Sequence, residues 1–188
     1  MRTVSPEGAA AVLRAGGVAL VPTETVVGLV AAEPGLPRIR QTKVREADKP
    51  IALLCTSAEE AFSLAGETHR LALRLAERYW PGPLTLVLDR PGGGTVGVRV
   101  PAGRAARELL AAYGEPLFAT SANVAGEPAP RSLEDVDPRV SGAVDVALEG
   151  ESGSGEASAV VDLSGGGIKL LRSTSGLTDQ ILTRLAGS

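Results

Sequence analysis

Short apolar runs, each about the length of one β-strand, are spread along the sequence, and several follow one another with no helical pattern between them. Parallel neighbours need a long crossover connection, so strands that follow one another directly require antiparallel pairing. Amphipathic patterns separate the other runs, which is typical of α/β proteins. The sequence therefore predicts one domain, residues 1–188, built on a mixed sheet with flanking helices. The expected strands are residues 18–22, 26–31, 51–55, 84–89, 96–101, 117–122, 144–148, 159–163 and 168–172.

Helix start and stop signals set the expected helices. Ser5 followed by Pro6 is a good helix start, and Gly16 is a suitable stop. Ser57 begins a spacing typical of a capping box. The expected helices are residues 5–15, the first half of 36–49, the pattern from 57 to 80, 102–113, a short stretch at 132–138, and 177–186.

Composition excludes several classes of protein. Hydrophobic residues are 44% of the chain and aromatic residues only 3%, so the core must be built from Ala, Val and Leu. The net charge of −3 argues against a uniformly basic nucleic-acid binder, although it is compatible with a local basic groove. No uncharged apolar run approaches the roughly 18 residues of a membrane span, and the N-terminus has no apolar signal region. We therefore expect a cytoplasmic protein that makes no membrane contact.

The chain has a single cysteine, Cys55, and a single histidine, His69. A disulfide within the chain is therefore impossible, and a structural zinc site made of Cys and His is out of reach. A mechanism that uses histidine would depend on His69. Because His69 lies in an amphipathic pattern, we expect it to be a surface helix residue instead.

Two glycine-rich segments are interpreted as connections. Residues 92–97 match the G-x-G-x-x-G pattern, but the sequence that follows them is strand-like and ends at Pro101, whereas a dinucleotide-binding motif requires a helix there. We expect a hairpin connection. Residues 149–158 are acidic and rich in Gly and Ser, so we expect a mobile surface loop; the sequence leaves open whether it closes over a site.

Three polar segments are candidates for a binding site, and each has a purely structural alternative. Residues 22–25 place two hydroxyls and a carboxylate between two strands, where they could bind a small polar ligand or only cap a turn. Residues 38–49 gather five basic side chains, which could hold a polyphosphate or form a solvated charged face. Residues 120–128 follow a strand and could bind a ligand at its carboxyl end or cap the backbone.

These three segments, together and in this order, resemble the YrdC-like family of threonylcarbamoyl-AMP synthases. The resemblance is strongest over residues 5–176, and we expect the second domain of longer family members to be absent. It implies a twisted α/β sheet with a concave, positively lined cavity. The matching blocks are PTETVVGL (22–29), KVR followed by KP (43–45 and 49–50), WPGPLTLVL (80–88), VGVRVP (96–101), TSANVAGEP (120–128), AVVDL (159–163) and LLRSTSG (170–176).

The resemblance implies an enzyme that makes threonylcarbamoyl-AMP and pyrophosphate from L-threonine, bicarbonate and ATP. A threonylcarbamoyl transferase complex would then modify the adenosine beside the tRNA anticodon. Mg²⁺ is expected on the phosphates, with no protein metal ligands. The residues that match the family's catalytic set are Lys43, Arg45, Ser121 and Asn123. Those that match its threonine site are Thr23, Arg99 and Ala119, and those that match its nucleotide site are Arg45, Lys49, Thr95, Ser121 and Arg172. Arg99 is expected to hold a carboxylate through two parallel bonds.

Four positions depart from the family pattern by losing a polar group: Val27, Leu54, Ala129 and Ala159. These departures leave two alternatives. One is an RNA-binding paralogue without synthase activity, which would bind tRNA or double-stranded RNA through residues such as Arg38 and Arg40. The other is a related carbamoyl-adenylate enzyme that uses another amine or alcohol.

Overall fold

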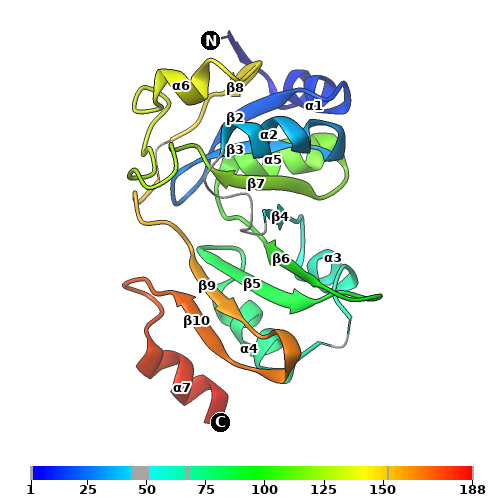
Figure 1. Ribbon diagram of the computed structural model, residues 1–188, viewed down its shortest axis with the longest axis vertical. Helices are drawn as coiled ribbons and strands as arrows, with labels where there is room; N and C mark the ends of the chain where they lie inside the picture. The colour runs from blue at the N-terminus through cyan, green and yellow to red at the C-terminus, as the bar shows by residue number, and fades with distance from the viewer. Residues whose placement is uncertain (1, 44–50, 67, 152, 188) are drawn as a thin grey trace.

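A computed structural model describes residues 2–43, 51–66, 68–151 and 153–187, and its centre is one ten-stranded mixed sheet (Figure 1). The strand order is β1-β8-β2-β3-β7-β4-β6-β5-β9-β10. The strands are β1 (Arg2–Val4), β2 (Val18–Pro22), β3 (Val27–Ala31), β4 (Ala52–Leu54), β5 (Leu84–Asp89), β6 (Thr95–Arg99), β7 (Leu117–Ser121), β8 (Val146–Leu148), β9 (Ala159–Asp162) and β10 (Lys169–Arg172).

Both kinds of pairing occur, which confirms the mixed sheet. β1 and β2 run parallel to β8, β4 runs parallel to β6, and β5 runs parallel to β9. The other pairs are antiparallel, including β2 with β3 and β5 with β6, whose strands follow one another directly in the sequence. Residues 92–94 form the β5–β6 hairpin turn, and all three glycines there have positive φ. The hairpin interpretation of that segment is therefore confirmed.

The helices are α1 (Pro6–Arg14), α2 (Leu36–Thr42), α3 (Ala58–Ser63), α4 (Arg70–Tyr79), α5 (Arg104–Tyr113), α6 (Pro138–Ser141) and α7 (Asp179–Gly187), with short 3₁₀ turns at Glu33–Gly35 and Ser164–Gly166. The expected caps are present: the hydroxyls of Ser5 and Ser57 accept backbone N–H groups of α1 and α3. His69 lies at the N-cap of α4, where its Nδ1 accepts the amide of Leu71 at 3.1 Å.

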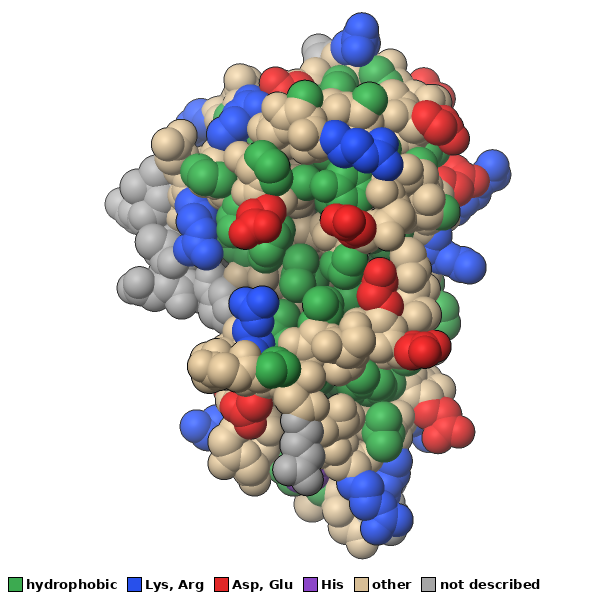
Figure 2. Space-filling view, turned by 90° about the vertical axis from the view of Figure 1, so that its right-hand side faces the viewer, with side chains coloured by type: hydrophobic (Ala, Val, Ile, Leu, Met, Phe, Trp, Pro, Cys, Tyr) green, Lys and Arg blue, Asp and Glu red, His purple; other side chains and the backbone are tan. Residues whose placement is uncertain are grey.

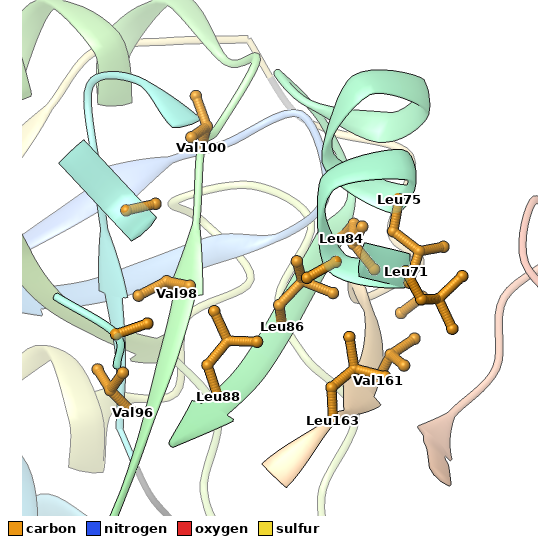
Figure 3. Close-up of a cluster of buried hydrophobic side chains, with 14 of the residues drawn as sticks. Leu71, Leu75, Leu84, Leu86, Leu88, Val96, Val98, Val100, Val161 and Leu163 are labelled. Carbon is orange, nitrogen blue, oxygen red and sulfur yellow. The ribbon is translucent and has the colours of Figure 1, made fainter. Parts of the chain in front are cut away.

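The sheet divides into an upper half (β1, β8, β2, β3, β7) and a lower half (β6, β5, β9, β10), with β4 between them (Figure 1). In the lower half, Leu71 and Leu75 of α4 pack toward Leu84, Leu86 and Val161 of the sheet (Figure 3). In the upper half, α1 and α5 cover one face and α2 with α6 the other. The core is made mainly of Ala, Val and Leu, as expected. No helix in the described ranges has the length and apolarity to cross a bilayer.

Candidate active site

A cavity of about 480 Å³ lies over the middle of the sheet, between the upper and lower halves. It is lined by four basic side chains and six hydroxyl side chains, and among the described residues it has no acidic lining side chain. In a chain with a net charge of −3, this is a local concentration of positive charge. The basic and hydroxyl lining residues are Arg40, Lys43, Arg99, Arg172, Thr23, Thr25, Thr85, Thr120, Ser121 and Ser158.

Lys43 and Ser121 line the upper side of the cavity and both contact Asn123, which is not itself a lining residue, although Lys43 lies far from the other two in sequence. Lys43 follows α2 directly and is only 4% exposed. Its Nζ donates to the carbonyl oxygen of Asn123 at 2.7 Å and to Asn123 Oδ1 at 3.0 Å. Ser121 Oγ donates to the same Oδ1 at 2.5 Å. These three members of the expected catalytic set therefore form one connected cluster of a cation, a hydroxyl and an amide.

The remaining basic residues of segment 38–49 do not act as one group. Arg40 lines the cavity, whereas Arg38 turns away to pair with Asp145, with 2.6 Å between Nη1 and Oδ2. The predicted site residues Arg45 and Lys49 lie outside the described residues. On the face shown in Figure 2, basic and acidic side chains are interspersed, and neither sign forms a continuous patch.

The hydroxyl of Thr23 is committed to its own turn. Thr23 Oγ1 lies 2.7 Å from the carbonyl oxygen of Val26, which can only accept, so Thr23 donates its proton there. In the 2.8 Å contact between Thr23 Oγ1 and Thr25 Oγ1, Thr25 must then be the donor. The turn-capping interpretation therefore holds for this hydroxyl. Thr23 still lines the cavity, but it has no hydroxyl proton left for a ligand.

Arg99, on β6, has three of its five N–H donors committed within the protein. Its Nε donates to the carbonyl oxygen of Gly82 at 3.1 Å, and its Nη2 donates to Glu24 Oε1 at 2.6 Å and to Thr25 Oγ1 at 3.0 Å. Within the described part of the chain, Nη1 makes no hydrogen bond. In this arrangement Arg99 offers Nη1 to a ligand, and two parallel bonds to a carboxylate would also need a nitrogen that now has a protein partner. The expected two-bond contact therefore stays a prediction.

The Glu24 carboxylate is held at both oxygens. Oε1 accepts from Arg99, and Oε2 accepts from the backbone amide of Gly103 at 2.8 Å, just before α5. Burial raises the pKa of Glu24, but the positive charge of Arg99 and the hydrogen bonds from Arg99 and Gly103 outweigh burial, so the pKa lies below its usual value. Glu24 is therefore ionised at neutral pH, and it neutralises part of the Arg99 charge.

The lower wall carries a second polar cluster. The hydroxyls of Thr85 and Ser158 are both buried and lie 3.0 Å apart. Arg172 donates through Nε to the carbonyl oxygen of Ser158 at 2.5 Å and through Nη2 to Ser158 Oγ at 3.2 Å.

Two other predicted site residues differ in position. Ala119 lines the cavity from β7, whereas Thr95 is exposed at the hairpin end of β6, outside the lining. The structure thus brings Arg172 and Ala119 to the cavity and leaves Thr95 outside its lining.

Several lining residues were missed by the sequence analysis. Thr85 and Ser158 come from segments 73 residues apart, and their pairing depends on β5 lying beside β9. The available signal was a hydroxyl inside an otherwise apolar strand at Thr85.

Of the four positions that depart from the family pattern, Leu54 lines the cavity, whereas Val27 and Ala159 are packed in the core. Ala129 is half-buried outside the lining.

Residues 149–158, which we call the strap, connect β8 in the upper half to β9 in the lower half (Figure 1). The amides of Ser154 and Gly155 donate to the carbonyl oxygens of Glu24 and Thr25 at 3.0 and 2.8 Å. The Glu156 carboxylate accepts the amide and hydroxyl of Ser175 at 2.9 and 2.8 Å. The described part of the strap is therefore hydrogen-bonded to both halves, while most of its residues remain at the surface.

Residues 11–174 match the Sua5/YciO/YrdC family, which carries the description "Telomere recombination". A threonylcarbamoyl-AMP synthase of Pyrococcus abyssi is 38% identical over 83% of this chain and 50% of its own length. A threonylcarbamoyl-AMP synthase of Stenotrophomonas maltophilia is 35% identical over 81% of this chain and 90% of its own length.

Solved structures agree with the family match. P. abyssi Sua5 complexed with L-threonine superposes with a TM-score of 0.87 at 35% identity, over 97% of this chain and 57% of that one. E. coli YciO superposes with a TM-score of 0.82 at 24% identity over 94% of this chain and 92% of that one, which supports the fold alone. This chain spans about half the length of the Pyrococcus and Bacillus relatives.

Proposed function

The chain belongs to the Sua5/YciO/YrdC family, and from that membership we propose that it is an L-threonylcarbamoyladenylate synthase. The observation that carries the proposal is the cavity, where basic and hydroxyl side chains converge without a described acidic one. Such a lining suits a triphosphate beside an amino acid. The substrates are L-threonine, bicarbonate and ATP, and the products are threonylcarbamoyl-AMP and pyrophosphate.

The reaction forms two bonds. The amine of threonine attacks bicarbonate, and loss of water gives a carbamate. A carbamate oxygen then attacks the α-phosphorus of ATP, and pyrophosphate leaves with the electron pair of the broken P–O bond. The protein contributes mainly positioning and positive charge against the growing negative charge. Lys43 is the described cation best placed for this, because Asn123 fixes its ammonium beside Ser121.

The polar residues on the two sides of the cavity suggest where each substrate binds. We assign the threonine carboxylate to Nη1 of Arg99, with Ala119 and the Thr23 turn forming the surrounding surface. We assign the nucleotide to Lys43, Ser121 and Arg172. By family resemblance, Arg45, Lys49 and Thr95 would complete the nucleotide site, although Thr95 could act only on a ligand that extends beyond the described cavity.

Mg²⁺ is proposed to enter with ATP, bound by the phosphates and by water. The described cavity lining offers it no carboxylate, and no group of three potential metal ligands occurs among the described residues. The product is proposed to pass to a threonylcarbamoyl transferase complex that modifies tRNA, in the cytoplasm, where tRNA and ATP are available.

The test is pyrophosphate release by the purified protein with ATP, Mg²⁺ and bicarbonate, with and without L-threonine. We expect release that depends on threonine and bicarbonate, and a product with the mass of threonylcarbamoyl-AMP. L-Valine, which has a methyl in place of the threonine hydroxyl, is the matched control. Release that is independent of threonine at saturating ATP would contradict the proposal.

A second candidate, a carbamoyl-adenylate enzyme for another amine or alcohol, is favoured by Leu54, an apolar lining residue at one of the four positions that depart from the family pattern by losing a polar group. A thermal-shift panel of amino acids with ATP separates the two candidates, because a ligand of the folded state raises the melting temperature. A larger shift with another compound than with L-threonine would favour this candidate.

Binding of double-stranded RNA at low salt without threonine-dependent turnover would favour the RNA-binding alternative.

A further inference from the structure

Glu24 and Thr25 enclose one nitrogen of Arg99 from two sides. Both hydrogens of Arg99 Nη2 are committed, one to Glu24 Oε1 at 2.6 Å and the other to Thr25 Oγ1 at 3.0 Å. Nε is held separately by Gly82 at 3.1 Å. The Arg99 side chain is 9% exposed, so these contacts are made away from bulk water, where hydrogen bonds are strong. The plane of the guanidinium is therefore fixed by three partners.

The hydrogen-bond chain around Arg99 has one direction. Arg99 donates to Thr25, Thr25 donates to Thr23, and Thr23 donates to the carbonyl oxygen of Val26. At the other end, Glu24 is held by the Gly103 amide at 2.8 Å. Because the carboxylate is fixed at both oxygens, Glu24 acts as a rigid support for Arg99.

We propose that Glu24 and Thr25 are positioning residues that hold Nη2 of Arg99 and so direct Nη1 toward the carboxylate of the amino-acid substrate. The inference rests on the proposed function, because it takes Arg99 as the carboxylate-binding residue. It assigns the Thr-Glu-Thr turn a role in orienting Arg99. The Thr23 hydroxyl of this turn has no proton left to donate to the substrate.

The direction in which Glu24→Gln changes carboxylate binding distinguishes a positioning role from a purely electrostatic one. Glu24→Gln removes a negative charge beside an anion-binding arginine, so Coulomb attraction alone would tighten binding of a carboxylate. A positioning role predicts that Glu24→Gln weakens binding of the carboxylate. A glutamine presents one acceptor and one donor, so it cannot accept from both Arg99 and the Gly103 amide, and the guanidinium loses its fixed orientation.

The experiment measures the steady-state kinetics of the full chain for the wild type, Glu24→Gln and Glu108→Gln. We expect Glu24→Gln to raise the KM for L-threonine by about tenfold, the effect of one lost charge-assisted hydrogen bond. The KM for ATP and kcat should change less than about twofold, as expected for a lost ground-state contact. Glu108→Gln is the matched control, because Glu108 is a half-exposed glutamate that pairs with Arg104 and should leave all constants unchanged.

A second pair of variants distinguishes the loss of Arg99 positioning from misfolding of the protein. Thr25→Val keeps the shape of the side chain but removes the acceptor for Nη2, so it should also raise the KM for threonine. Thr25→Ser keeps the hydroxyl and should restore wild-type behaviour. If the wild type shows no threonine-dependent turnover, the proposed function fails and the inference fails with it. If the wild type is active and Glu24→Gln has an equal or lower KM for threonine, only the positioning role is overturned.

Discussion

At the scale of single residues, Lys43 combines burial with a fixed charge. A lysine that is 4% exposed is unusual, because desolvation of an ammonium is costly unless oxygens replace its water. Asn123 supplies two such oxygens, at 2.7 and 3.0 Å from Nζ. The protein thus maintains a cation inside the cavity, where the low dielectric strengthens its effect on a phosphate.

Replacing Lys43 tests this role directly. We expect Lys43→Ala to lower kcat by about 100-fold or more, the loss typical of one electrostatic contact to a developing charge. The melting temperature should fall by only a few degrees, because the variant also removes a buried charge. The measurement pairs turnover with thermal unfolding.

Lys169→Ala is the matched control for Lys43→Ala, since Lys169 is exposed on β10 and should be neutral in both measurements. A Lys43→Ala enzyme with near-normal turnover would remove Lys43 from the proposed mechanism.

The sequence could name the polar residues of the cavity but not their contacts. Lys43, Ser121 and Asn123 were identified by local motifs, yet their meeting requires β3 to lie beside β7. The expectation for Arg99 could not take account of Glu24, 75 residues away, which accepts a hydrogen bond from Nη2. Contacts of this kind depend on the tertiary structure, and local sequence patterns carry no signal for them.

At the scale of elements, the strap depends on one close backbone approach. At Gly153, a Cβ atom would lie 2.4 Å from the carbonyl oxygen of Thr25 and 2.6 Å from that of Thr23. Such contacts are too short for any side chain, so only glycine lets the strap lie directly on the turn that carries Glu24.

Gly153→Ala should therefore displace the strap from the turn. We expect a several-fold higher KM for L-threonine, because the Ser154 and Gly155 amides would lose their acceptors on Glu24 and Thr25. Gly176→Ala is the control: its added Cβ meets nothing within 4 Å and its φ is ordinary. Equal threonine kinetics in both variants would show that the strap has no part in the site.

Elements with a strong apolar pattern were predicted well, and weakly patterned ones were not. The strands of residues 18–22 and 84–89 have the predicted bounds, because their side chains are almost all buried. β1 was missed because its three residues are mostly exposed. The short helix expected at 132–138 lies instead at Pro138–Ser141, where Asp137 caps it and the proline occupies the first turn.

At the scale of the whole molecule, the strand order joins three hydrophobic clusters, one in the lower half and two in the upper half, across the cavity. One core lies beneath the lower half of the sheet, and two clusters lie on the faces of the upper half. The sequence indicated a mixed sheet, but the order of its strands depends on long-range pairing, such as β1 with β8, which local periodicity does not encode. The ion pair between Glu24 and Arg99 links the upper half to the lower half at the cavity.

That ion pair should make the stability of the molecule depend on pH in a defined direction. The pKa of Glu24 is lowered in the folded protein relative to the unfolded value of about 4.3. The unfolded chain therefore binds a proton more readily, and the pair contributes stability at pH values above the unfolded pKa. This contribution is lost as the pH falls through the folded pKa, where the folded protein also takes up the proton.

The measurement is urea unfolding of the wild type and Glu24→Gln at pH 7 and near pH 3. At pH 7, we expect the free energy of unfolding of Glu24→Gln to be lower by about 1–3 kcal/mol, since a buried charged hydrogen bond is lost. Near pH 3 the difference should shrink, because below the unfolded pKa the unfolded wild type takes up a proton, which offsets the stability that the ionised pair contributes. Glu108→Gln, which removes a surface carboxylate, should track the wild type at both pH values. A difference of the same size at pH 3 and pH 7 would show that Glu24 stabilises the fold by its shape and not by its charge.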